Sequence, residues 1–302
     1  MRRSVLSLFT SMILVAATLT HAQAAPTTTI SFVAHPDDDL LFMNPDIASD
    51  VEAGSTVWVV YLTAGEVHTR PPFPYANQRV EGERAAYART AGVADSWTYE
   101  EMWFNGHPVA TNRLNGTNVR LVFTYIHGAS GGCDHPNGDP QGDLYKMLAF
   151  SPYVAQPIDG RPSYNRFSFV GMLRAIIAQA NPDHIRSGST IGHRDSPRRD
   201  HVDHVSAALL VAEANLADGT RDTWKRRDEY TAYNSESYPE NVSGYWRQRK
   251  EEIWDAYWPH DPEIPHRDIH PYAFGRQIRP EGRIFWPGSA WVPPGDFVEN
   301  GC

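Results

Sequence analysis

The sequence predicts an α/β fold with three layers, in which helices cover both faces of a mostly parallel β-sheet. Two β-branched apolar runs, TTTISFVA at 27–34 and TVWVVYL at 56–62, have the length and composition of buried strands. A helical pattern follows each run: one at 39–52, which Pro45 kinks or divides, and one at 78–91, which stops at Gly92. Because strands that alternate with helices pair in parallel, this order is typical of a Rossmann-like domain.

The second half of the chain continues this pattern after a long break. Residues 169–180 (FVGMLRAIIAQA) are strongly amphipathic, 184–186 suggest a short strand, and helices are expected at 201–216 and 245–258. Residues 97–167 instead hold many Gly, Pro, Asn and aromatic residues. We expect this segment to be a lid-like insertion that lies over one face of the sheet.

The first 24 residues are expected to be a signal peptide rather than part of the fold. Arg2 and Arg3 precede an apolar run at 5–19, and Ala22-Gln23-Ala24 offers a small-residue cleavage site. An uncleaved N-terminal anchor is the alternative. We therefore expect a secreted protein, without stable membrane association after cleavage, in which residues 25–302 form a single domain.

Charge and cysteine content narrow the possible partners. The net charge is −9 with neutral histidines and no Lys/Arg block occurs, so nucleic acid is not an expected partner. The only cysteines, Cys133 and Cys302, are expected to form one disulfide in an exported protein, with two free thiols as the alternative. Their number also excludes a zinc site built from cysteine pairs.

A histidine and two aspartates directly follow the first predicted strand, in the order His35-Pro36-Asp37-Asp38. Because ligands gather beyond the carboxyl ends of parallel strands, these side chains should project into a crevice. They can offer a metal one nitrogen and one oxygen and leave a second carboxylate for acid–base chemistry. The alternative is a hydrated turn whose aspartate caps the next helix.

A second group, His201-Val202-Asp203-His204, opens the helix expected at 201–216. Residues three apart share a helix face, so both histidines can point to one site. Asp203 either orients one of the histidines from outside the site or is an ordinary carboxylate at a helix start. A solvent-exposed helix start is the alternative for the whole group.

Taken together, the two groups resemble the LmbE-like or PIG-L family of zinc-dependent N-deacetylases. Members carry A-H-P-D-D-E after the first strand, L-T-x-G-E after the second, and H-x-D-H in the C-terminal half. Here these segments are Ala34 to Asp39, Leu62 to Glu66 and His201 to His204, and the resemblance covers about residues 28–95 and 170–216. Asp39 stands where the family usually has Glu, which leaves its own role open.

The resemblance implies that His35, Asp38 and His204 bind Zn²⁺, an N/O/N set that leaves room for water and substrate. It also implies that Asp37 is the general base that takes a proton from the attacking water. Protonated His201 would then stabilise the oxyanion or protonate the leaving amine. Elementary chemistry agrees, because zinc lowers the pKa of bound water to about 7 and an imidazolium can stabilise a developing oxyanion.

Other polar residues near the same predicted edge are candidate substrate contacts. Glu66 and His68 follow the second strand, Arg79 lies close to the arginine position of the family's R-x-x-E helix, and His193 precedes the second group. The charged stretches His193 to Asp195 and Arg198 to Asp200 either contact substrate at the rim or are solvated loops. The irregularly spaced histidines at 260, 266 and 270 are interpreted as surface residues.

The expected reaction is hydrolysis of the N-acyl group of an N-acylglucosaminyl moiety, which gives a free amine and a carboxylate. In its expected export and its aromatic, Gly-rich insertion, the sequence resembles the family branch that acts on the pseudoaglycone of glycopeptide antibiotics of the teicoplanin type. The alternatives are an exported deacetylase of chitin-like or cell-wall amino sugars, and a non-catalytic carbohydrate-binding protein. A free Asp37 beside the ligand pair favours catalysis.

Overall fold

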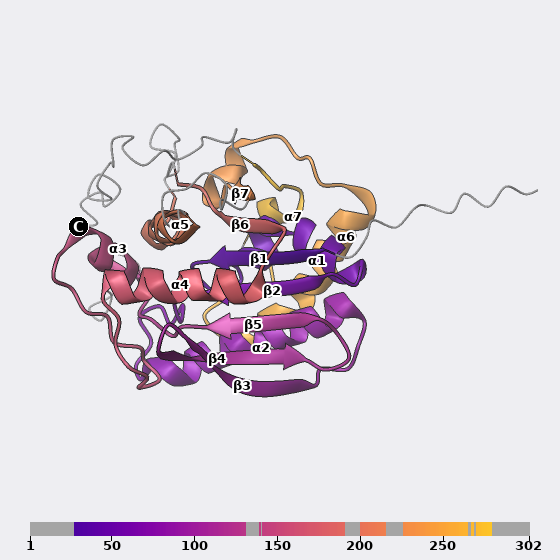
Figure 1. Ribbon diagram of the computed structural model, residues 1–302. Coiled ribbons are helices and arrows are strands. Elements are labelled where there is room, and N and C mark those ends of the chain that lie inside the picture. Colours follow the sequence, from indigo (N-terminus) through magenta and orange to yellow (C-terminus); the bar gives the residue numbers. More distant parts are fainter. Residues whose placement is uncertain are drawn as a thin grey trace, which may run out of the picture.

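A computed structural model describes residues 27–130, 139, 141–190, 200–215, 226–264, 267–268 and 270–279. Within this part of the chain, seven strands form one sheet in the order β3-β4-β5-β2-β1-β6-β7. Helices lie on both faces of the sheet (Figure 1). The three-layer α/β class is therefore confirmed. The expected signal peptide, Cys133, Cys302 and His193 lie outside the described residues.

Five parallel strands form the centre and one side of the sheet: β5 (Val119–Phe123), β2 (Thr56–Tyr61), β1 (Thr28–Val33), β6 (His184–Gly188) and β7 (Arg226–Tyr230). β1 is central, because Ile30 pairs with Trp58 of β2 on one side and with Ile185 of β6 on the other. Every residue of β1 after Thr28 is buried. A strand covered on both faces needs no polar alternation, which explains the unbroken β-branched run in the sequence.

Four long helices cover the sheet: α2 (Pro72–Ala91), α4 (Arg166–Ala180), α5 (Val202–Asn215) and α6 (Gly244–Tyr257). Successive residues of β2 face opposite layers, so that Tyr61 packs with residues of α2 and α6, whereas Val60 packs with residues of α4 and α5. Figure 1 shows α4 crossing in front of the strands. Both faces of the central strands are thereby removed from water.

The predicted helices are present, with shifted starts. The pattern at 39–52 is two short helices, η1 (Asp39–Met43) and α1 (Asp46–Glu52), divided at Pro45. α2 begins earlier than predicted because Pro72 is favourable in a first helical turn, and it ends at Gly92 with a φ of 65°. α4 also begins early, since Asn165 accepts a hydrogen bond from the backbone N–H of Ser168.

The prediction that residues 97–167 form a lid over one face is wrong for the first part of that segment. β3 (Trp97–Phe104), β4 (His107–Leu114) and β5 instead extend the sheet at one edge. The antiparallel pair β3–β4 turns at Asn105-Gly106, both with positive φ, and Asn-Gly favours tight hairpins. Side chains along β3 alternate between exposed and covered positions, as in an edge strand. The rest of the segment includes α3 (Gly142–Ala149).

The chain after β7 adds η4 (Tyr233–Ser237), α6, η5 (Trp258–His260) and α7 (Pro271–Phe274). α6 packs closely against α2, where Gly82 leaves room for the ring of Tyr257. This part of the chain therefore belongs to the same core as the predicted strands and helices.

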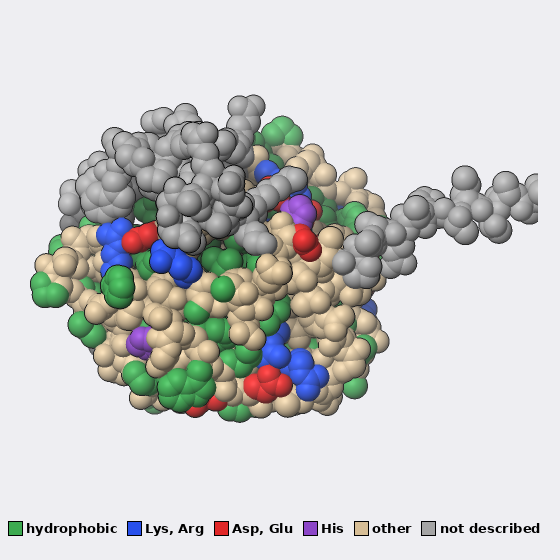
Figure 2. Space-filling view, in the orientation of Figure 1, with side chains coloured by type: hydrophobic (Ala, Val, Ile, Leu, Met, Phe, Trp, Pro, Cys, Tyr) green, Lys and Arg blue, Asp and Glu red, His purple; other side chains and the backbone are tan. Residues whose placement is uncertain are grey.

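In the described part of the chain, no helix has the length and apolar character that crossing a bilayer requires. Figure 2 shows one face of the molecule, on which acidic and basic side chains stand in small mixed groups among polar and apolar ones. Such mixing is typical of a surface exposed to water.

Candidate metal centre and pocket

Loops at the carboxyl ends of the parallel strands build one pocket. β1, β2, β5, β6 and β7 run in the same direction, so the loops that follow them meet at one edge of the sheet. A pocket of about 270 Å³ lies there. Its wall comes from the loops after β1, β2, β5 and β7, the starts of α2 and α5, and the segment after α6, including His35, Asp37, His68, Ser130, His201 and Tyr233.

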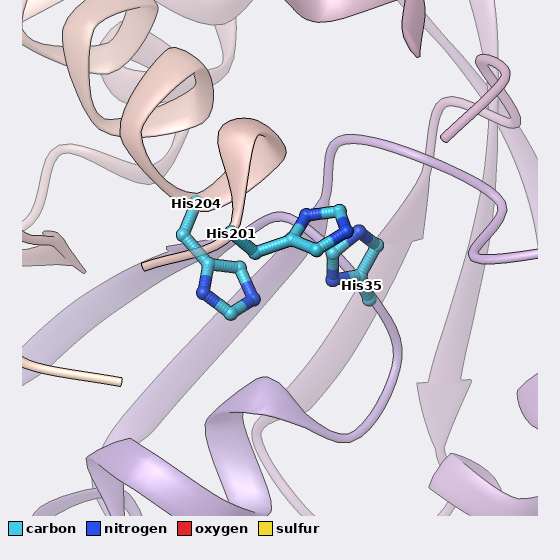
Figure 3. Close-up of side chains that lie close together, drawn as sticks. All are labelled: His35, His201 and His204. Carbon is cyan, nitrogen blue, oxygen red and sulfur yellow. The ribbon is translucent and has the colours of Figure 1, made fainter. Parts of the chain in front are cut away.

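Three histidines meet beside this pocket. His35 follows the end of β1, while His201 and His204 come from the start of α5, and Figure 3 shows their rings gathered together. One ring nitrogen of each histidine lies within 4.8 Å of those of the other two. The fold thus brings together the two groups of residues that the sequence singles out.

Aspartates hold one ring nitrogen of His35 and one of His204. Nε2 of His35 lies 3.1 Å from Oδ2 of Asp203, and Nδ1 of His204 lies 2.7 Å from Oδ1 of Asp200. An ionised carboxylate only accepts hydrogen bonds, so each of these nitrogens carries a hydrogen. In a neutral ring, the opposite nitrogen then keeps its lone pair. This is the arrangement by which an outer carboxylate orients a metal-binding histidine.

The inner nitrogens of both rings face Asp38. Nε2 of His204 lies 3.0 Å from Oδ1 of Asp38, and Nδ1 of His35 lies 3.4 Å from Oδ2. Although close to Asp38, Nε2 of His204 is buried and has no aligned hydrogen-bond partner among the described residues. One inner nitrogen of each ring thus faces an oxygen of the same carboxylate, as ligands of one ion would. These residues therefore fit a divalent metal.

The charges around the centre also favour a cation. Asp38, Asp200 and Asp203 are all buried, and buried carboxylates require positive charge nearby. Burial alone would lower the pKa of His35, but Asp38 and Asp203 raise it to about 9. Burial likewise lowers the pKa of His204, whereas Asp38 and Asp200 raise it well above its usual value. Protons and a metal ion would therefore compete for this centre.

His201 differs from the other two histidines. Its Nδ1 accepts a 3.2 Å hydrogen bond from the backbone N–H of Asp203, so the ring hydrogen is on Nε2. Burial lowers its pKa, and the charge of His35 lowers it further, to about 4. Near pH 7 the ring is thus neutral, in contrast to the protonated form that the family resemblance implies. With this hydrogen on Nε2, His201 is suited to donate a hydrogen bond into the pocket.

Asp37 lies next to the candidate metal ligands in a backbone conformation that few residues adopt. Its φ is 105°, a strained value for any residue but glycine. The backbone N–H of Asp37 donates a 2.6 Å hydrogen bond to Glu83. Burial raises the pKa of the Asp37 carboxyl to about 7, although the guanidinium of Arg79, 2.7 Å away, opposes this shift. A carboxyl group with a pKa near 7 can accept and return a proton in neutral solution.

Asp39 lies behind the site and supports its loop. Its Oδ2 accepts hydrogen bonds of 3.0 Å from the hydroxyl of Tyr61 and 2.6 Å from that of Tyr87. The Tyr61 hydroxyl is also 2.8 Å from Oε2 of Glu83. Burial raises the pKa of both carboxyls, that of Asp39 to about 6. The departure from the family's glutamate therefore falls on a supporting position.

The expected substrate contacts occupy different places. His68 and Arg79 line the pocket, but Arg79 is buried and donates to protein atoms. Glu66 is also buried, and its carboxylate accepts a 3.2 Å hydrogen bond from the N–H of Gly128 and lies 2.5 Å from Nδ1 of His127. Glu66 thus holds the loop after β5. His193 lies outside the described residues.

Several residues at the site lie outside the two sequence motifs and are not predicted by those motifs. Asp200, expected at a rim or in a solvated loop, is buried against His204, and its spacing of four from that histidine is the one clue that the sequence offers. Tyr233 and Asp261 line the pocket from beyond β7. His270, expected at the surface, also lines the pocket, with its ring 5.7 Å from that of Tyr233.

Comparison with known proteins gives one family match. The family model PIG-L, GlcNAc-PI de-N-acetylase, matches residues 30–215. No curated protein matches the chain.

Solved structures are similar to this chain only at low identity. The N,N'-diacetylchitobiose deacetylase from Pyrococcus horikoshii is 14% identical with a TM-score of 0.45, over 82% of this chain and 76% of that one. The A40926 pseudoaglycone deacetylase Dbv21 is 13% identical with a TM-score of 0.42, over 82% and 86%. The 4-carboxy-2-hydroxymuconate hydratase GalB from Pseudomonas putida KT2440 is 13% identical with a TM-score of 0.41, over 79% and 84%. At these values the solved structures decide nothing about the reaction.

Proposed function

Because the chain belongs to the PIG-L family of GlcNAc-PI de-N-acetylases, we propose that it is a metal-dependent hydrolase that removes the acyl group from an N-acylated amino sugar. The observation that carries this proposal is the convergence of His35 and His204 on Asp38, beside a pocket that also holds Asp37 and His201. One site would thus combine candidate metal ligands, a proton acceptor and a hydrogen-bond donor. Hydrolysis of an amide needs these three parts.

His35, Asp38 and His204 would hold the metal, and we propose that it is Zn²⁺. Two imidazoles and one carboxylate form the ligand set of many catalytic zinc sites, which keep a further position open. When bound, such an ion supplies Lewis-acid polarisation of the amide carbonyl and makes water a stronger acid.

Asp37 is proposed to accept a proton from water as the water oxygen bonds to the acyl carbon. The carbonyl oxygen then gains negative charge, and the Nε2–H of His201 donates a hydrogen bond to it. When the carbon–nitrogen bond breaks, Asp37 returns the proton to the leaving nitrogen. The products are a free amine and a carboxylic acid, and Asp37 is again ionised.

The pocket suits a sugar residue as the reacting unit. About 270 Å³ holds a small ligand, so the remainder of a large conjugate would lie outside. The rings of Tyr75 and Tyr233 can contact a sugar face, and Ser130 can hydrogen-bond to hydroxyls. We propose an N-acylglucosaminyl group on a glycopeptide-antibiotic pseudoaglycone, and export through residues 1–24. Chitin-like and cell-wall amino sugars are the alternative substrates.

Product analysis by mass spectrometry tests the proposal. The protein should remove the acyl mass from at least one of N-acetylglucosamine, N,N'-diacetylchitobiose and a teicoplanin-type pseudoaglycone. A chelator should abolish this activity and Zn²⁺ should restore it. Activity that survives complete metal removal would contradict a metal-dependent reaction, and no product from any N-acyl sugar would contradict the substrate class. Sequencing the N-terminus of protein recovered from the medium tests export.

A further inference from the structure

Arg79 connects three segments that build the pocket. It lies on α2 and is 5% exposed, and each of its three side-chain nitrogens contacts a protein oxygen. Nη1 donates to the carbonyl of Gly65 at 2.7 Å, and Nη2 donates to the carbonyl of Pro36. Nη2 also lies 2.7 Å from Oδ2 of Asp37. The Nη1 and Nη2 groups of Arg79 therefore bind the loops that follow β1 and β2.

The other end of the guanidinium is held by the chain that follows α6. Nε of Arg79 donates to the hydroxyl of Tyr257 at 2.9 Å and lies 3.0 Å from Oδ2 of Asp261. The Tyr257 hydroxyl in turn lies 2.9 Å from Oδ2 of Asp261 as a donor. Tyr75 donates to Oδ1 of Asp261 at 2.5 Å. Asp261 is 1% exposed, so its carboxylate acts inside the protein.

Two glycines make room for this chain of contacts. Gly65 has a φ of 58°, and a side-chain carbon there would clash with Nη1 of Arg79. At Gly82 of α2, a side-chain carbon would come within 2.8 Å of the ring of Tyr257. The approach of Arg79 to the loop and of α6 to α2 therefore depends on residues without side chains.

Asp37 needs such support because its backbone is strained. A φ of 105° persists only where the surroundings determine it. The contacts that do so are Glu83 at the backbone N–H and Arg79 at the carboxylate. Since the same guanidinium also pairs with Asp261, the charge and position of Asp261 bear on where Arg79 places Asp37.

We propose that Asp261, with Tyr257, is a positioning residue that orients the carboxylate of Asp37 through Arg79. This inference rests on the proposed function, in which Asp37 is the proton acceptor. It assigns a catalytic task to a segment that lies outside the match to the family, which ends at residue 215. It also gives Arg79 a role other than substrate binding, because its donors are used within the protein.

The test compares Asp261→Asn with a matched control. Asp261→Asn keeps the shape of the side chain and removes the charge that faces Arg79. The control is Asp50→Asn, which removes the carboxylate from another Asp–Arg pair, the 2.7 Å contact between Asp50 of α1 and Arg186 of β6. Should Asp261→Asn fail to fold, Tyr257→Phe is a second variant, because it removes the hydroxyl that contacts both Arg79 and Asp261.

Kinetics and metal content are the first measurements, on the zinc-loaded protein with the sugar that the wild type accepts. Asp261→Asn should lower kcat about 10- to 100-fold, since displacement of a reacting group by even 1 Å has such effects. KM and zinc content should stay within about 2-fold of wild type, and Asp50→Asn should leave kcat unchanged. An unchanged kcat in Asp261→Asn overturns the inference, as does a rise in KM alone, which would assign the segment to substrate binding.

Hydrogen exchange tests the same coupling without activity. In Asp261→Asn, but not in Asp50→Asn, amides in the loops 35–39 and 63–67 should exchange faster than in wild type. Equal exchange in these loops overturns the inference. If the wild type cleaves no N-acyl sugar, the proposed function fails, while the exchange result still decides whether Asp261 holds the loop of Asp37.

Discussion

Replacement of Asp203 by Asn should weaken metal binding in a measurable and graded way. Oδ2 of Asp203 accepts two hydrogen bonds, from Nε2 of His35 at 3.1 Å and from the backbone N–H of Ala129 at 2.5 Å. The side chain is fully buried. Asn has the same shape and keeps one oxygen in this place, so Asp203→Asn removes the negative charge behind His35 and little else. Asp203→Ala removes the charge and both acceptor contacts.

The expected magnitude follows from these contacts. Loss of an outer partner of a metal-binding histidine costs about 10- to 100-fold in metal affinity, or about 1.4 to 2.7 kcal/mol. Asp203→Asn should lie near the lower value, because its oxygen can still accept from His35. Asp203→Ala should lie near the upper value. Binding should not be abolished, since the pair of Asp200 with His204 remains.

Competition between the protein and a chromophoric chelator for Zn²⁺, at constant pH, measures these affinities. Asp143→Asn is a suitable control, because Asp143 is a buried carboxylate whose partner is Tyr153 at 2.5 Å rather than a histidine of the site. Its affinity should equal that of wild type. If Asp203→Asn and Asp203→Ala both bind Zn²⁺ as tightly as wild type, the reasoning that Asp203 orients a metal ligand is refuted.

Three further predictions concern the proposed base, the pH dependence of one histidine–carboxylate contact, and the pocket wall. Asp37→Asn should retain zinc and lower kcat by about 10²- to 10⁴-fold; loss of the metal instead would show that Asp37 is a ligand. A hydrogen bond to Glu66 raises the pKa of His127, so this contact stabilises the protein fully below about pH 6.5 and loses its effect as pH rises through the raised pKa. The difference in Tm between wild type and His127→Gln should therefore shrink from about pH 6 to about pH 9, and a constant or growing difference would contradict the assignment. Val67 lines the pocket with a φ of 52°, so Val67→Gly should raise KM while Tm stays equal or rises, because relief of about 1–2 kcal/mol of strain offsets the added backbone entropy of about 0.5–1 kcal/mol; a clear fall in Tm would contradict this.

The sequence predicts the adjacent strands β1 and β2 well and the two edge strands poorly, because their burial differs. β1 and β2 are covered on both faces, so they appear as unbroken β-branched runs. β3 (WTYEEMWF) and β7 (RRDEY) lie at the two edges of the sheet and carry the charged residues that edge strands tolerate. Only the Asn105-Gly106 turn marks the β3–β4 hairpin, within a segment whose composition suggests a loop.

At the site, residues placed by local structure are easier to predict than residues placed by contacts between distant segments. His35, Asp37 and Asp38 follow a buried strand, and His201 and His204 open a helix, so local structure alone directs them to one edge of the sheet. Their outer partners are harder to predict, because a hydrogen bond such as that of Asp203 to His35 exists only once the strand end and the helix start have met.

The far wall of the pocket depends on still more distant structure, which bears on how such an enzyme divides its tasks. Tyr233 closely follows β7, whereas Asp261 and His270 lie beyond α6, which packs against α2. The candidate metal ligands and their aspartates, in contrast, all lie within residues 35–204. Asp261 connects the pocket wall with the proposed base, because this residue lines the pocket and its buried carboxylate pairs with Arg79, which contacts Asp37.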